Sequence, residues 1–115
     1  GVTGTPPKPE IEKTALGATE TVSWSYFKTT REAIDELKAK GYFVASVEQA
    51  KQSVMLNRFQ KPAQPIALVF GNEVYGVEQD IIDESDACIE IPQFGTKHSF
   101  NVSVSMGIVL WELLR

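Results

Sequence analysis

Residues 91–101 read I-P-Q-F-G-T-K-H-S-F-N, and they join a short apolar run, residues 87–91, to a long segment with an apolar stripe, residues 102–115. The run predicts a strand and the stripe predicts a helix, so residues 91–101 form a strand-to-helix loop. Pro92 lacks a backbone donor and Gly95 tolerates turns that other residues resist, so the chain can leave the sheet sharply. In α/β proteins, loops of this kind bind ligands at the carboxyl edge of the sheet.

Polar side chains gather near the end of this loop. Ser99 and Asn101 bring a hydroxyl and an amide to the start of the helix, where backbone N–H groups lack partners. They can cap the helix or hold a ligand, and the residues alone leave both interpretations open. His98 has no evident triad partners, and one histidine with one cysteine does not make a ligand set. We therefore expect neither a hydrolase nor a metal centre.

The upstream part of the chain alternates between strand and helix patterns. Thr29 and Glu32 form the capping box T-x-x-E, which predicts the start of a helix that ends at Gly41. A second, shorter helix is predicted over residues 77–85. The apolar and β-branched runs that predict strands are residues 22–26, 42–47, 65–70 and 88–91.

This alternation predicts an α/β fold, a mostly parallel sheet with helices on both faces. Residues 65–70 are continuously apolar, the pattern of a strand covered on both sides, whereas residues 48–64 are polar and irregular. Parallel strands joined by helices end at the same edge of their sheet. Glu48, the loop of residues 71–76 and the loop of residues 91–101 should therefore converge on one pocket.

The final helix carries a wide apolar surface. Its stripe and the residues that widen it are Val102, Met106, Val109 and Leu113, with Ile108, Leu110, Trp111 and Leu114. A surface this wide predicts burial on more than one side, by the sheet and by a second subunit.

Composition bounds the class of protein. With 115 residues, 43% of them hydrophobic and 23% charged, the chain is typical of one soluble globular domain. The net charge of −4 argues against non-specific coating of nucleic acid or anionic membrane, although a local basic patch is compatible with it. No apolar run approaches the ~20 residues that cross a bilayer, and the first residues lack a signal-peptide pattern. The single cysteine, Cys88, lies in an apolar run, as expected for a buried thiol in a cytoplasmic protein.

The loop G-N-E-V-Y-G, residues 71–76, has the glycine spacing that opens a phosphate loop. Val77 and Glu78 stand where lysine and serine or threonine are required, and Glu73 would repel phosphate. A nucleoside triphosphate or a dinucleotide is therefore excluded as the expected ligand. A carboxylate beside glycines that let the backbone approach a ligand closely suits a ligand with an apolar base and a positive centre. The alternative is a tight turn with an exposed glutamate.

Two segments resemble a known family. L-V-F-G-N-E-V-Y-G-V, residues 68–77, and I-P-Q-F-G-T-K-H-S-F-N-V-S-V-S, residues 91–105, resemble the second and third motifs of the SpoU family of RNA ribose 2'-O-methyltransferases, within the SPOUT superfamily. G-V-T-G-T-P-P and K-T-A-L-G-A, residues 1–7 and 13–18, are similar to the same family, so the resemblance covers nearly the whole chain. It implies a SPOUT-type α/β fold with a C-terminal trefoil knot, a rare exception among protein chains.

The resemblance also implies S-adenosyl-L-methionine as the methyl donor, tRNA or rRNA as the substrate, and a homodimer. The residues that it assigns to the donor are Gly71, Ile91 and Phe100, with Glu48 as a further candidate, and Phe100 stands where the family commonly has leucine. The residues that it assigns to the catalytic site are Glu73, Ser99 and Asn101. A basic rim at the carboxyl edge would meet RNA through Lys51, Arg58, Lys61 and Lys97, unless these are ordinary surface charges.

One motif of the family is missing. The first motif, with the arginine that assists deprotonation of the ribose hydroxyl, belongs upstream of residue 1, and none of Arg31, Arg58 and Arg115 stands in that context. We therefore expect residues 1–115 to be one SpoU-type methyltransferase domain that is truncated at its N-terminus. It would keep the donor pocket without its chief catalytic residue. Two alternatives are a non-catalytic dimerisation module that binds donor or RNA, and a flavodoxin-like nucleotide or flavin binder.

Overall fold

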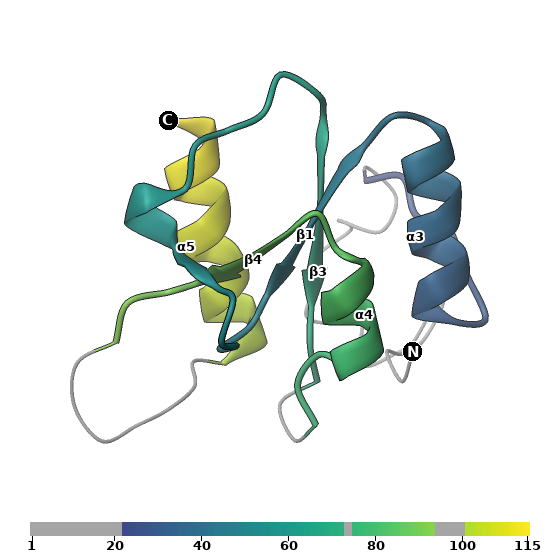
Figure 1. Cartoon of the computed structure of the whole chain (residues 1–115). Helices are drawn as coiled ribbons and strands as arrows, with labels where there is room; N and C mark the ends of the chain where they lie inside the picture. The colour runs from purple at the N-terminus through teal and green to yellow at the C-terminus, as the bar shows by residue number, and fades with distance from the viewer. Residues whose placement is uncertain (1–21, 73–74, 94–100) are drawn as a thin grey trace.

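The computed structural model describes residues 22–72, 75–93 and 101–115 (Figure 1). Its helices are α3 (Thr30–Ala39), α4 (Gln79–Glu84) and α5 (Val102–Leu114), with one short 3-10 helix, η1 (Leu56–Arg58). Its strands are β1 (Phe43–Val47), β2 (Val54–Met55), β3 (Ile66–Phe70) and β4 (Ala87–Glu90). The predicted helices, and the predicted strands from residue 42 onward, are confirmed in position.

The strands form one parallel sheet. In the described part of the chain its order is β2-β4-β1-β3. Ala45 of β1 pairs with Leu68 on one side and Ala87 on the other, and Ile89 of β4 pairs with Val54. The predicted parallel α/β fold is confirmed, and parallel pairing brings the carboxyl ends of β1, β3 and β4 to the same edge.

Helices cover both faces of the sheet, as predicted. Figure 1 shows α5 on one side and α3 and α4 on the other. The core beneath α5 consists of Ala45, Leu56, Ile89, Ile91, Val109 and Leu113. The core on the other face consists of Ile34, Val44 and Ile81. Neighbouring residues of β1 point to opposite faces, so Val44 and Ala45 belong to different cores.

Helix α3 begins and ends where the sequence predicts. The Thr29 side chain accepts the Glu32 N–H at 3.2 Å, and Gly41 has a φ of +89°, which favours glycine. Arg31 then joins this helix to α4 through ion pairs with Asp80 and Glu84. The Lys38 ammonium also donates to the Glu84 carbonyl, so two basic side chains of α3 hold α4 against it.

Three predictions about local structure are wrong. Residues 22–26 are not a strand, and Val22, Trp24 and Tyr26 are exposed, because apolar alternation makes a strand only where a neighbouring strand accepts its hydrogen bonds. The segment 48–64 contains β2 and η1, which are too short to produce a periodic pattern. Strand β3 is half-buried rather than covered on both faces, because among the described residues it is an edge strand paired only with β1.

The sheet covers one stripe of α5, as predicted. Val109 and Leu113 are buried against the sheet, but Met106, Trp111 and Leu114 are 42%, 74% and 81% exposed. One sheet can bury only one stripe of a helix, so among the described residues the second side of α5 lies open, and its burial by a second subunit stays a prediction. None of the helices in the described residues is long and apolar enough to cross a membrane.

Candidate functional site

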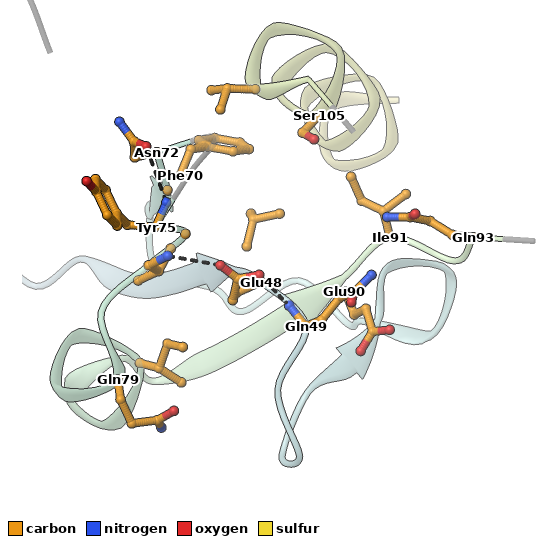
Figure 2. A pocket seen from close by; sticks show the side chains of 16 residues that line it. Glu48, Gln49, Phe70, Asn72, Tyr75, Gln79, Glu90, Ile91, Gln93 and Ser105 are labelled. Carbon is orange, nitrogen blue, oxygen red and sulfur yellow. Dashed lines mark hydrogen bonds between the residues drawn. The ribbon is translucent and has the colours of Figure 1, made fainter. Parts of the chain in front are cut away.

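The carboxyl ends of β1, β3 and β4 surround a cavity of about 460 Å³, which we call the carboxyl-edge cavity (Figure 2). Glu48, Gly71 and Ile91 line it, one from the end of each strand. The first turns of α5 close another side through Val102 and Ser105. The predicted meeting of Glu48 with the two loops is confirmed for the described residues, and the volume is that of a small-molecule site.

Sheet register explains this convergence. Val47, the last residue of β1, pairs with Phe70 of β3 and with Ile89 of β4. The residues that follow these positions therefore leave the sheet at one level. Parallel pairing alone would bring the loops after β1, β3 and β4 to one edge of the sheet. This register also places the starts of the three loops side by side.

Glu48 projects its carboxylate into the cavity from the end of β1. Its Oε1 atom accepts the N–H of Gln49 at 2.9 Å, and its Oε2 atom accepts the N–H of Val77 at 2.9 Å. The backbone N–H of Glu48 donates to the Ile89 carbonyl at 3.0 Å. Glu48 therefore joins β1, β4 and the segment after β3.

The described residues Gly71, Asn72, Gly76 and Val77 form what we call the glycine turn. The Asn72 carbonyl accepts the Gly76 N–H at 2.8 Å, and its side-chain oxygen accepts the Tyr75 N–H at 3.3 Å. Gly76 has a φ of +67°, and a Cβ atom on Gly71 would lie 2.3 Å from the Gly76 carbonyl carbon. Larger side chains at either glycine would therefore break the turn.

Asn101 is the N-cap of α5. Its Oδ1 atom accepts the Ser103 N–H at 2.8 Å, and its side chain is exposed. The capping interpretation is thus confirmed for Asn101. Asn101 itself does not line the carboxyl-edge cavity, whereas the next residue, Val102, does. Its role in catalysis stays a prediction.

Several predicted site residues lie outside the described residues. They are Glu73, Lys97, Ser99 and Phe100. Their assignments to catalysis, RNA and donor therefore stay predictions.

The predicted basic rim is dispersed in the structure. Lys51 lies at the carboxyl edge, in a hollow that shares Gln49, Gln79 and Glu90 with the carboxyl-edge cavity. Arg58 is exposed on η1, which packs beside α5. Lys61 does not belong to the rim. Its ammonium donates to the Leu113 carbonyl at 2.8 Å, at the end of α5 far from the cavity, because the chain has by then turned back toward the start of β3.

Sequence reasoning missed other residues of the cavity wall. They include Gln49, Gln79 and Glu90, whereas Asn72, Tyr75 and Gln93 lie in the two loops that were predicted to meet at this pocket (Figure 2). Most of them stand within two residues of a predicted strand end or glycine, and that position in the sequence could have indicated that they line the cavity.

Cys88 lies behind Glu48 and is buried as predicted. Its Sγ atom donates to the Glu48 carbonyl at 3.4 Å, and burial raises the pKa of its thiol.

Comparison with known proteins identifies a family. The family model described as the SpoU rRNA Methylase family matches residues 3–111 of this chain. The tRNA (guanosine(18)-2'-O)-methyltransferase TARBP1 of Mus musculus is 40% identical over 82 residues, which cover 71% of this chain and 5% of that protein. The 23S rRNA (guanosine-2'-O-)-methyltransferase RlmB of Ralstonia nicotianae is 33% identical over 106 residues, which cover 91% of this chain and 41% of that protein.

A solved structure is similar over most of the fold. The crystal structure of an AdoMet-bound rRNA methyltransferase from Sinorhizobium meliloti matches 97% of this chain and 42% of its own, with a TM-score of 0.88 and 27% identity. The chain therefore spans less than half the length of each of these three proteins.

Proposed function

Because this chain belongs to the SpoU rRNA methylase family, we propose that it carries the S-adenosylmethionine site of a tRNA or rRNA ribose 2'-O-methyltransferase. One observation carries the proposal. Gly71 and Ile91, which the family resemblance assigns to the methyl donor, line the same cavity as Glu48, the further candidate. The three residues follow or end three different strands. Residues 1–115 form one SpoU-type domain in this proposal, in line with the match over residues 3–111.

The reaction suits such a cavity. The ribose 2'-oxygen attacks the methyl carbon of the sulfonium, the carbon–sulfur bond breaks with its electron pair on sulfur, and neutral S-adenosylhomocysteine leaves. The 2'-hydroxyl proton passes to a base, a step that the family's upstream arginine assists. Because the donor is already activated, the protein mainly aligns the 2'-oxygen, helps remove its proton and excludes water.

Glu73, Ser99 and Asn101 are the proposed catalytic residues of this chain. The α5 cap uses the side-chain oxygen of Asn101, so the N–H₂ donors of its amide can hold a ribose oxygen. Gly71, Ile91 and Phe100 are the proposed donor contacts. Among the described residues of the predicted basic rim, Lys51 is the best placed to meet RNA, because the hollow in which it lies adjoins the carboxyl-edge cavity.

A second copy of the chain is the proposed partner of α5. Leu110, Trp111 and Leu114 are exposed there, and Leu56, Ile108 and Trp111 contribute to an apolar depression beside them. Isolated exposed apolar residues are ordinary, but a contiguous patch on one helix favours an interface. A cytoplasmic homodimer accommodates both this patch and the buried, unpaired Cys88.

The trefoil knot is also part of this proposal. β4 lies inside the described sheet, between β1 and β2, and α5 follows it in the chain and packs back over Ala45 and Ile89. Helix α5 thus continues from an interior strand, which is compatible with the threading of the C-terminal segment through a loop that the family resemblance implies. A crystal structure of the whole chain tests it, and an unthreaded path from β4 to α5 would remove the knot from the proposal.

Calorimetry and methyl transfer test the function. We expect the 115-residue chain to bind S-adenosylmethionine, and a chain extended upstream with the family's first motif to transfer labelled methyl groups to bulk tRNA or rRNA. Absence of donor binding would overturn the proposal. Binding without transfer, even with the upstream segment restored, would favour the non-catalytic module. Robust transfer by the chain alone would make the upstream motif dispensable.

A further inference from the structure

We propose that Glu48 is a positioning residue of the donor site, which holds the glycine turn in the conformation that binds the methyl donor. The inference rests on the proposed function and adds a role to it. Glu48 would act on the donor through the turn, by accepting a backbone N–H, and not as a free negative charge beside the sulfonium.

The carboxylate lies between two backbone segments. Figure 2 shows it with one hydrogen bond toward the turn that follows Tyr75 and one toward Gln49. The bond to Val77 spans 29 residues of sequence, and the bond to Gln49 is local. Both side-chain oxygens thus already accept a donor in the protein, and each donor would lose its acceptor if the carboxylate were removed.

The turn is shaped to receive this carboxylate. A Cβ atom on Gly76 would lie 2.4 Å from Oε2 of Glu48, too close for any real contact. A Cβ atom on Gly71 would collide with the backbone of Gly76 and Val77. The two glycines therefore allow the turn to fold onto Glu48, and Gly71 is one of the residues proposed to contact the donor.

The backbone of Glu48 is held from the core side. Its N–H donates to Ile89, and its carbonyl accepts the thiol of buried Cys88 at 3.4 Å. A side chain on so restrained a backbone can fix the position of the turn to which it is hydrogen-bonded. Binding sites that are already in the bound conformation gain affinity because less ordering is required on binding.

The test compares Glu48→Gln with Glu78→Gln in the full 115-residue chain. Glutamine keeps the volume at position 48 but offers one acceptor oxygen where two N–H groups need one each. Glu78 is one residue from Val77, is exposed and makes no side-chain cap bond, so it controls for loss of charge near the turn. The ligands are S-adenosylmethionine, which is cationic at sulfur, and S-adenosylhomocysteine, which is not.

We expect Glu48→Gln to weaken binding of both ligands by about tenfold or more, and Glu78→Gln to weaken neither. Amide hydrogen exchange at Val77 should accelerate in Glu48→Gln without ligand, while the global unfolding transition stays cooperative. Gly76→Ala should also weaken both ligands, and the double variant should lose less than the product of the two effects, because both changes disturb one contact.

Three results would overturn the inference. They are unchanged affinity in Glu48→Gln, unchanged exchange at Val77, and a loss confined to the cationic ligand, which would indicate a direct charge role. A wild-type chain that binds neither ligand would instead overturn the proposed function. Even if neither ligand binds, the rate of amide hydrogen exchange at Val77 would show whether Glu48 holds the turn.

Discussion

The Arg31 guanidinium of α3 lies 2.8 Å from the Glu84 carboxylate of α4, and the same guanidinium lies 3.1 Å from Asp80. Helix α4 follows the glycine turn in the chain, so these ion pairs hold the helix after the turn against α3. All three side chains are largely exposed, and exposed pairs of this kind contribute modestly and weaken with salt.

This contact predicts a pH dependence of stability. The hydrogen bond from Arg31 lowers the pKa of Asp80 in the folded protein. A carboxylate whose pKa is lowered by folding contributes stability above its unfolded pKa and loses it as the pH falls through the folded value. Asp80→Asn should therefore have a lower Tm than wild type at neutral pH, with the difference closing below about pH 4. A difference that persists in acid would contradict the assignment.

Two adjacent leucines of α5 should differ sharply in their effect on stability. Leu113 is 8% exposed and Leu114 is 81% exposed. Leu113→Ala should lower the free energy of unfolding by about 2–5 kcal/mol, because it leaves a cavity beneath the helix. Leu114→Ala should change it by about 0.5 kcal/mol or less in the monomer. Urea unfolding at low protein concentration measures both values. Equal losses of unfolding free energy would mean that α5 is rotated about its axis relative to this structure.

The open side of α5 predicts an oligomeric state. Trp111→Ser should convert a dimer to a monomer in sedimentation experiments, because it removes the largest exposed apolar side chain of the helix. Trp24→Ser is the matched control. Trp24 is 50% exposed but lies outside α5, so the dimer should persist in that variant. A wild-type chain that is monomeric at all concentrations would end this prediction.

Asn101 allows capping to be separated from catalysis. Asn101→Ala should destabilise the protein by about 1 kcal/mol through loss of the cap. Asn101→Asp should retain stability, because aspartate caps equally well, but it removes the amide donors. In a chain extended upstream with the family's first motif, we expect methyl transfer to fall in both variants. Full activity of Asn101→Asp would restrict Asn101 to its structural role.

Two lysines should respond differently in RNA binding. Lys51→Gln should weaken tRNA binding and reduce its dependence on salt concentration, because one phosphate contact is lost. Lys61→Gln should leave RNA binding unchanged and lower the Tm, because its ammonium donates to the end of α5. Filter binding over a salt series measures the first effect. Equal effects of the two substitutions on RNA would restore Lys61 to the rim.

Local chemistry determined much of this protein. Signals carried by a few neighbouring residues appear where they were predicted. They are the N-cap at Thr29, the stop at Gly41 and the apolar runs of β1 and β3. The alternation of strands and helices was enough to predict a parallel sheet. It also placed Glu48, Gly71 and Ile91 at one edge, because the strands of a parallel sheet all end at that edge.

Tertiary structure decided what meets across the chain. Residues 22–26 have the pattern of a strand but no neighbour among the described residues, Lys61 binds the end of α5, and the Glu48 carboxylate accepts the Val77 N–H. Periodicity and caps depend on residues a few positions apart, so the sequence by itself expresses them. Register, edge position and the partner of a side chain depend on surfaces brought together from distant segments, and these exist only after the sheet and its helices have packed.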